Sequence, residues 1–161
     1  MIASTIGILL LLAGGYLYFN SHNSSQNYLP LEQRKTVEAY FREHMNATPE
    51  EAKTMAENGV DLRVSKGTTL MGIVGNLYYY GFIDNEGEFT KLLGQTKDTT
   101  PGREGAIKAG NNTIDTNSSY YINSQMTDEE IADTLLNKGR YSDKFNQYNY
   151  LFMPSSKNQR L

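Results

Sequence analysis

Side chains that could carry acid-base or metal chemistry are spread thinly along the sequence. His22 and His44 have no partner at metal-ligand spacing, and the absence of cysteine excludes disulfides and thiolate metal sites. Glu51 and Glu130 each stand three positions after a threonine, which is the spacing of a helix capping box. The other acids expected near helix starts, where the positive helix end favours carboxylates, are Asp84, Glu86, Glu88, Asp128 and Glu129. All of these positions have structural explanations, so we expect no catalytic residue, metal or cofactor among them.

The elements that would position a site centre on one stretch, 60–89. Apolar and polar residues alternate over 60–64, which predicts a half-buried strand, and Ser65-Lys66-Gly67 offers a turn after it. Thr68 or Thr69 can cap the helix that follows, and Gly81 is placed to end it. The apolar positions of that helix are Leu70, Ile73, Val74 and Leu77. A second short helix follows, with Phe89, Leu92 and Leu93 on one face.

A second strand-to-helix unit with the same pattern lies 58 residues further on, over 121–136. In this alignment Ile122 corresponds to Val64, and the capping residue Thr127 corresponds to Thr69. The apolar helix positions that correspond to Ile73 and Leu77 are Ile131 and Leu135. The sequence therefore raises the hypothesis of an internal repeat, against the alternative that two amphipathic units match by chance.

The apolar and turn residues of both units fall into an ordered set of short motifs. They are Val64-Ser-Lys-Gly-Thr-Thr-Leu70, Ile73, Leu77, Gly81-Phe-Ile83, Phe89, Ile107-Lys-Ala-Gly110, Tyr121-Ile122 and Met126-Thr-Asp-Glu-Glu-Ile131 to Leu135. This set resembles the LysM-like region of the YceG-like family, whose members are membrane-anchored endolytic murein transglycosylases. The resemblance covers roughly 60–139. It implies an α+β fold built on a LysM-like βααβ unit, a two-stranded antiparallel sheet with helices packed on it, followed by a further helix.

The catalytic part of that family is not matched by this chain. The family uses a glutamate in a separate downstream domain, in a stretch resembling Glu-Gly-Tyr-Leu-Phe-Pro, because glycan cleavage needs an acid that protonates the glycosidic oxygen. Here Tyr150-Leu-Phe-Met-Pro154 is weakly similar to that stretch. The positions where the glutamate would be needed are occupied by Gln147, Tyr148 and Asn149. The resemblance thus implies binding rather than catalysis.

The resemblance also implies where a glycan would bind, since LysM folds hold N-acetylated glycans along the loops around their helices. The positions implied here are Ser65, Lys66, Gly67, Thr68 and Thr69, together with Gly81, Phe82 and Ile83. The competing interpretation is structural, with the glycines permitting turns, the threonines capping a helix and Phe82 lying in the core. Tyr78, Tyr79 and Tyr80 point about 100° apart on a helix, so we expect at least one to be exposed for contact with sugar or a partner.

The N-terminal region predicts a membrane anchor. Residues 1–19 carry no charged side chain and are long enough to span a bilayer core of about 30 Å. The alternatives are a cleaved signal peptide and a buried core helix. A signal peptide fits less well because a basic n-region and a small-x-small cleavage site are missing. Residues 20–30 are predicted to be a flexible tether, and 31–58 a helical region that is either a membrane-proximal spacer or a lid packed on the domain.

The remaining segments are predicted to be a polar loop over 95–105 and an Asn/Ser/Thr-rich insertion over 111–119. Residues 140–161 form an aromatic-rich C-terminal segment, in which Tyr148, Tyr150 and Phe152 alternate as in a strand that could extend the sheet. From Ser155 onward we expect a disordered tail.

Together these features predict a single-pass protein of the bacterial cell membrane whose extracytoplasmic domain binds peptidoglycan glycan strands or a cell-wall synthesis protein. One alternative is the front part of a truncated or split transglycosylase, and another is a protein-interaction module of the division or sporulation machinery. The net charge of −3 gives no reason to expect nucleic acid as a partner, since a domain that binds it usually shows a basic patch.

Overall fold

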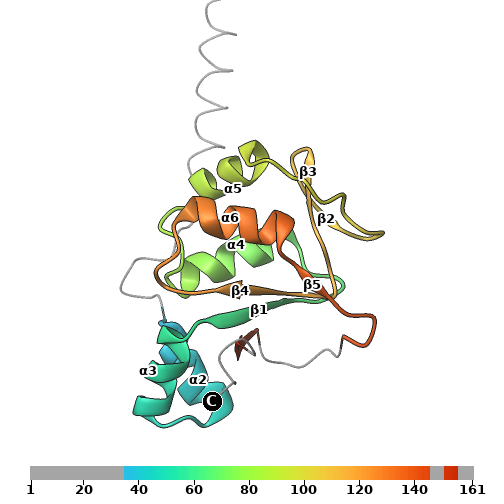
Figure 1. Cartoon of the computed structure of the whole chain (residues 1–161). Helices are drawn as coiled ribbons and strands as arrows, with labels where there is room; N and C mark the ends of the chain where they lie inside the picture. The colour runs from blue at the N-terminus through green and yellow to red at the C-terminus, as the bar shows by residue number, and fades with distance from the viewer. Residues whose placement is uncertain (1–34, 146–150, 156–161) are drawn as a thin grey trace, which may run out of the picture. The chain divides into compact units, whose positions relative to one another are not determined.

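The computed structural model describes residues 35–145 and 151–155, which belong to one compact unit, Gln33–Leu161 (Figure 1). The described part contains five helices and two small antiparallel sheets, which confirms the predicted mixture of helix and antiparallel sheet. The helices are α2 (Val37–Met45), α3 (Pro49–Glu57), α4 (Leu70–Tyr79), α5 (Glu86–Gln95) and α6 (Asp128–Asn137). The strands are β1 (Val60–Val64), β2 (Ile107–Ala109), β3 (Asn112–Ile114), β4 (Ser118–Ile122), β5 (Arg140–Tyr141) and β6 (Phe152–Pro154).

The larger sheet has the strand order β5-β4-β1-β6, with every neighbouring pair antiparallel. The LysM-like unit was expected to have two strands, and the sheet has four because the C-terminal segment adds one short strand to each side of the central β1–β4 pair. The prediction that Phe152 lies in a strand extending the sheet is confirmed, since it pairs with Leu62 of β1. Tyr148 and Tyr150 of the same prediction lie outside the described residues.

Helix α4 follows β1 as the local sequence predicts. The Thr69 side chain accepts a hydrogen bond from the Gly72 amide, and Gly81 adopts a φ of +80° just after the helix. The Phe82 amide then donates to the Leu77 carbonyl at 2.9 Å, which satisfies one of the last carbonyls of the helix. The predicted start and end of this helix are thus both confirmed.

The β4–α6 unit repeats the β1–α4 unit at a constant separation of 58 positions. The strands cover 60–64 and 118–122, and the two ten-residue helices are capped by Thr69 and Thr127 at their starts. The turns agree as well, because the Thr68 amide donates to the Ser65 carbonyl and the Met126 amide donates to the Asn123 carbonyl. The geometry therefore supports the internal repeat.

The core lies between the β1–β4 pair and the helices that cover one face of it, α4 and α6 (Figure 1). Each strand turns alternate side chains toward these helices. The strand residues buried on this face are Val60, Leu62, Val64, Ser118, Tyr120 and Ile122. The corresponding helix positions, all 2% exposed or less, are Ile73, Leu77, Ile131 and Leu135. The spacing read from the sequence thus identified both inward helix faces.

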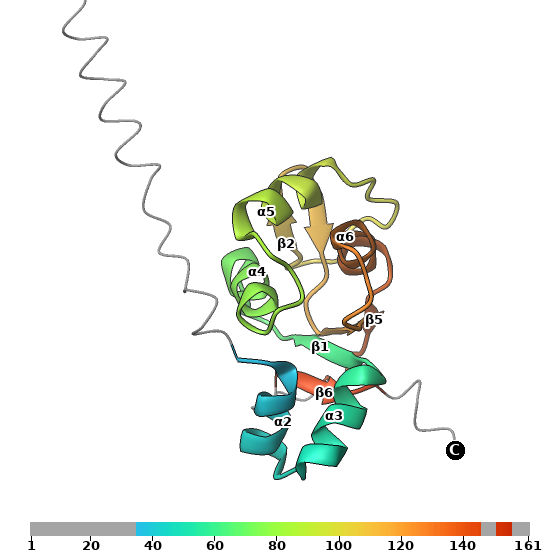
Figure 2. The ribbon, with the colours of Figure 1, turned by 90° about the vertical axis from the view of Figure 1, so that its left-hand side faces the viewer.

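Helices α2 and α3 are part of the folded unit, so of the two interpretations of 31–58 the structure agrees with the packed one. They lie beside β6, on the side of the sheet away from α5 and α6 (Figure 2). Tyr40 of α2 packs edge-on against Phe152 and Tyr80, with ring centroids 5.8 and 5.4 Å away. The Leu151 amide also donates to the Tyr40 hydroxyl. The unit consequently extends well beyond the expected limits of 60 and 139.

The loop predicted over 95–105 is irregular after the end of α5, as expected, whereas the insertion predicted over 111–119 contains strand β3 and the start of β4. Residues 107–114 form the β2–β3 hairpin, and Gly110 takes a φ of +65° at its turn. Three side chains hold the preceding segment in place. Asn112 Nδ2 donates to the Leu93 and Thr96 carbonyls, Asp98 accepts from the Thr113 amide, and Asn137 Oδ1 accepts from the Thr99 amide.

The predicted membrane anchor (1–19) and tether (20–30) lie outside the described residues. Within 35–145 and 151–155, no helix combines the length and apolar character that crossing a membrane would require. At the other end, Ser155 was expected to begin a disordered tail, and this expectation is wrong for that residue. Ser155 is 3% exposed and its amide donates to the Gly59 carbonyl at 3.3 Å. Residues 156–161 lie outside the description.

Candidate functional site

A cleft of about 470 Å³ opens beside the turn that joins β1 to α4. Four segments that are distant in sequence meet there: the β1–α4 turn, the loop before β2, the turn before β4, and β5. The lining residues are Lys66, Arg103, Glu104, Gly105, Thr116, Asn117 and Tyr141. Because β4 runs antiparallel to β1, its first residue Ser118 pairs with Val64, the last of β1. This register brings the segments together at one end of the sheet.

The β1–α4 turn presents Lys66 to solvent. Gly67 has a φ of +90°, which a residue with a side chain rarely adopts, and the space around it is open. The hydroxyl oxygens of Ser65 and Thr68 lie 3.4 Å apart across the turn. Backbone and side chains therefore fix the turn, while the exposed Lys66 ammonium projects from it.

Arg103 and Tyr141, which also line the cleft, are in contact with each other. The Arg103 amide donates to Asp115 Oδ1 at 2.7 Å, and the guanidinium Nε lies 3.6 Å from Asp115 Oδ2. The guanidinium carbon is 4.2 Å from the centroid of the Tyr141 ring, which is cation–π distance. Tyr141 is still 43% exposed, so an aromatic surface held in place by a cation faces the solvent.

The loop that carries Arg103 is pre-organised by the bonds of Asp98, Asn112 and Asn137 described above. Side-chain amides and carboxylates thus satisfy backbone groups that would otherwise need water. A surface loop held by its own side chains often serves function, because a ligand then meets a surface that needs little ordering.

The structure separates the two loops in which glycan contacts were predicted. Ser65, Lys66, Gly67, Thr68 and Thr69 lie at the start of α4, and 81–83 lie at its end. A ten-residue helix is about 15 Å long, so one sugar ring cannot touch both. Only the first loop contributes to the cleft, through Lys66.

At the end of α4, Gly81 is exposed, Phe82 is half-buried and Ile83 is buried, and the glycan contact expected there stays a prediction. Gly81 ends α4, and Ile83 is 2% exposed in the core. The Phe82 ring lies 5.4 Å from the Phe152 ring. The structural interpretation is the one that the geometry supports for these three residues.

The three consecutive tyrosines do not form an exposed aromatic surface. Tyr78 is 7% exposed, and the half-buried Tyr80 packs edge-on against Phe152 at 4.8 Å. Tyr79 is also half-buried, with its ring 4.9 Å from that of Tyr80. At least one of them was expected to be exposed, and the exposed surface that remains belongs to the half-buried Tyr79 and Tyr80. Among the described residues, the large hydrophobic side chains that are exposed are Met71 and Tyr141.

Sequence reasoning missed six of the seven lining residues. Arg103, Glu104 and Gly105 were predicted only as part of a loop, and Thr116 and Asn117 only as part of the 111–119 insertion. The available signal was topological, because a strand that pairs antiparallel with β1 must begin where β1 ends. Asn117, directly before β4, has a φ of +53°, in the left-handed region that asparagine adopts more readily than most residues.

The acidic residues keep structural roles. Thr48 with Glu51 and Thr127 with Glu130 form the two predicted capping boxes. Partial burial, together with the neighbouring carboxylates of Asp84, Glu129 and Glu88, raises the pKa of Asp128. Within the described ranges, no group of three or more histidine and acidic side chains could hold a metal ion.

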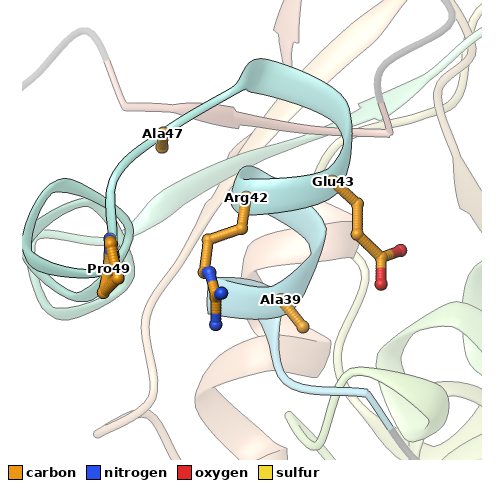
Figure 3. A pocket seen from close by; sticks show the side chains of 5 residues that line it. All are labelled: Ala39, Arg42, Glu43, Ala47 and Pro49. Carbon is orange, nitrogen blue, oxygen red and sulfur yellow. The ribbon is translucent and has the colours of Figure 1, made fainter.

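A second, shallower pocket of about 390 Å³ lies between α2 and α3, lined by Ala39, Arg42, Glu43, Ala47 and Pro49 (Figure 3). Glu43 accepts hydrogen bonds from Lys35 at 2.6 and 2.7 Å, which hold the pKa of its carboxyl below the usual value. The lining has no aromatic ring and its acid is already paired. The cleft at Lys66 is therefore the better candidate for a binding site.

Comparisons of this chain with protein-family models, with curated proteins and with solved structures gave no match.

Proposed function

We propose that this protein is a non-catalytic, LysM-like module that binds or positions peptidoglycan at the bacterial cell wall. In this proposal the chain is held at the membrane by residues 1–19 and its domain faces the extracytoplasmic side. The sequence resemblance to the YceG-like family is the source of the localisation and of the ligand class.

The chain order supports a LysM-like architecture. Strand β1 is followed by α4 and α5, and β4 then returns antiparallel to β1 with the helices on one face. This is the βααβ arrangement expected of a LysM fold. The β2–β3 hairpin, the β5 and β6 strands and the α2–α3 pair are additions around that unit.

The observation that carries the proposal is the exposed Tyr141 ring in a cleft next to the β1–α4 turn. Sugars present apolar ring faces and many hydroxyl groups, so their sites combine an aromatic surface with a few polar groups. This cleft offers the Tyr141 ring, the Thr116 hydroxyl and the Asn117 amide. An open volume of about 470 Å³ can admit a sugar unit of a longer strand.

The test is co-sedimentation of the full-length chain, in uncharged detergent, with insoluble peptidoglycan. We expect saturable binding by the wild type and clearly weaker binding by Tyr141→Ala, because the ring surface is removed. Met71→Ala is the matched control, since Met71 is a large exposed hydrophobic side chain, 82% exposed, that does not line the cleft. Circular dichroism checks that both variants are folded.

An equal loss of binding in Met71→Ala, or no effect of Tyr141→Ala, would contradict the assignment to this cleft. Absence of any wall binding would overturn the proposal and favour the protein-interaction alternative. Soluble muropeptides released during the same assay would instead favour the transglycosylase alternative.

A further inference from the structure

The cleft carries charged groups that a neutral glycan would not need. Two cations, Lys66 and Arg103, reach it from different segments, and Glu104 is the acid among its lining residues. Asp115 lies within ion-pair distance of Arg103 and is only 18% exposed, so it offsets much of that charge. Among the described residues, Lys66 has no salt-bridge partner. Within the described residues, Lys66 and Glu104 are thus a cation and an acid of the cleft that no salt bridge holds.

The neighbours of Lys66 suggest what would compensate it. The Tyr141 ring can hold the apolar face of a sugar, and Glu104 can accept hydrogen bonds from sugar hydroxyls or from an N-acetyl amide. A carboxylate attached to that same sugar would then meet the Lys66 ammonium at the rim. Such charge-assisted hydrogen bonds are stronger than bonds between neutral groups.

The cleft is also fixed in shape before any ligand arrives. Arg103 is held by Asp115 and by Tyr141, and Lys66 projects from a turn fixed by the Ser65–Thr68 bond. The held turn and the held Arg103 guanidinium favour a ligand that already carries its acid at a set distance from the ring, because less ordering of the protein is then required.

From this arrangement we infer that the cleft prefers an acidic glycan, one whose sugars carry free carboxylates, over a neutral glycan of the same length. The inference rests on the wall-binding function proposed above and names the ligand class for the same cleft. The Lys66 ammonium pairs with the carboxylate of the sugar, and the Tyr141 side chain packs against the sugar ring.

Two probes of equal length test the preference. Glycan strands of peptidoglycan freed of their peptides carry a carboxylate on alternate sugars, whereas chitin oligosaccharides are neutral. With full-length protein in uncharged detergent, calorimetric titration should give a Kd about tenfold lower for the acidic strands, as expected for hydrogen bonds to a charged group. That preference should shrink as salt is added, because the Lys66 contact is exposed.

The informative variant is Lys66→Gln, with Lys91→Gln as its control because Lys91 is an exposed lysine on α5 outside the cleft. We expect Lys66→Gln to bind the acidic strands about tenfold more weakly and the neutral oligosaccharides unchanged. Lys91→Gln should behave as the wild type. Thermal unfolding followed by circular dichroism shows whether either variant is misfolded.

The outcomes of these titrations distinguish a failure of the acidic preference from a failure of the proposed wall binding. Equal affinity for both probes would overturn the acidic preference and leave wall binding intact. A preference that survives in Lys66→Gln would overturn the assignment to Lys66. Displacement of the strands by free stem peptide would overturn the assignment to a sugar carboxylate. Failure to bind either probe or intact peptidoglycan would overturn both the inference and the proposed function.

Discussion

Leu62 and Tyr120 face each other at the middle of the β1–β4 ladder, and they also occupy the same position in the two repeated units. On either side of them the equivalent positions are exchanged. Val60 faces Ile122, and Val64 faces Ser118. An approximate two-fold axis therefore passes between Leu62 and Tyr120, and it relates the α4 half of the core to the α6 half.

The two helix starts related by this axis should respond alike to loss of their caps. Thr69→Ala and Thr127→Ala each remove a hydroxyl that accepts a backbone amide, at 3.0 and 3.3 Å. We expect each to lower the free energy of unfolding by about 1 kcal/mol, measured by urea denaturation. The serine variants at both positions should stay close to wild type, because serine keeps the acceptor. A large effect at one position alone would argue against energetic equivalence of the two units.

Gly59 and Gly67 both have positive φ angles, +87° and +90°, but very different surroundings. A Cβ on Gly59 would lie 2.6 Å from Cε2 of Tyr121, whereas nothing lies within 4 Å of one on Gly67. Gly67→Ala should therefore cost only the backbone strain, about 1–2 kcal/mol. Gly59→Ala should cost roughly 1–3 kcal/mol more, because the ring must move.

A double-variant cycle in urea denaturation isolates that steric part. On a Tyr121→Ala background, Gly59→Ala should cost no more than Gly67→Ala does in the wild type. If the excess at Gly59 persisted without the Tyr121 ring, the clash would not be its cause.

Phe152 tests whether the C-terminal strand belongs to the folded unit. Its ring is fully buried among Tyr40, Tyr80 and Phe82. Phe152→Ala should lower the free energy of unfolding by about 3–5 kcal/mol, the usual result of emptying an aromatic core position. Met71→Ala, at an 82% exposed position, should change it by less than about 0.5 kcal/mol. A small effect of Phe152→Ala would mean that β6 is only loosely attached.

Tyr80 links stability to alkaline pH. Burial, together with the neighbouring Tyr40, Tyr79 and Glu43, raises the pKa of its hydroxyl from 10.0 to about 12. Because the folded-state pKa lies above the unfolded value, the contribution to stability is complete below pH 10 and is lost as pH rises toward 12. The free energy of unfolding should thus fall over this interval, and it should fall less steeply in Tyr80→Phe.

Urea denaturation at several pH values between 8 and 12 measures this slope. Tyrosinate absorbance in the same samples should show one late-titrating group that is missing from Tyr80→Phe. Identical slopes in the two proteins would contradict the assignment to Tyr80.

Local signals were sufficient to predict β1, α4 and α6. Thr69, Gly81 and Thr127 act within a few residues of themselves, so their capping roles can be read from the sequence. The inward faces of both helices followed from apolar spacing in the same way.

The candidate site could not be predicted by such means, because its members meet only through strand register. Lys66 and Tyr141 are neighbours since β4 pairs with β1 on one side and with β5 on the other. In the same way, Phe152 arrives from the far end of the chain to cover Tyr80 and Phe82. Two aromatic residues that the local pattern made available for binding, Tyr80 and Phe82, are therefore half-buried.

Strand β6 covers the backbone edge of β1 that would otherwise be open to pairing with another strand. Without it, β1 would offer unpaired backbone groups beside the apolar side chains of Val60 and Leu62, a surface onto which the edge of another copy could dock. Three residues of pairing occupy that edge, and Pro154 lacks the amide that a further strand would need. Strand β6 therefore leaves less of the sheet edge open to pairing with another copy of the chain.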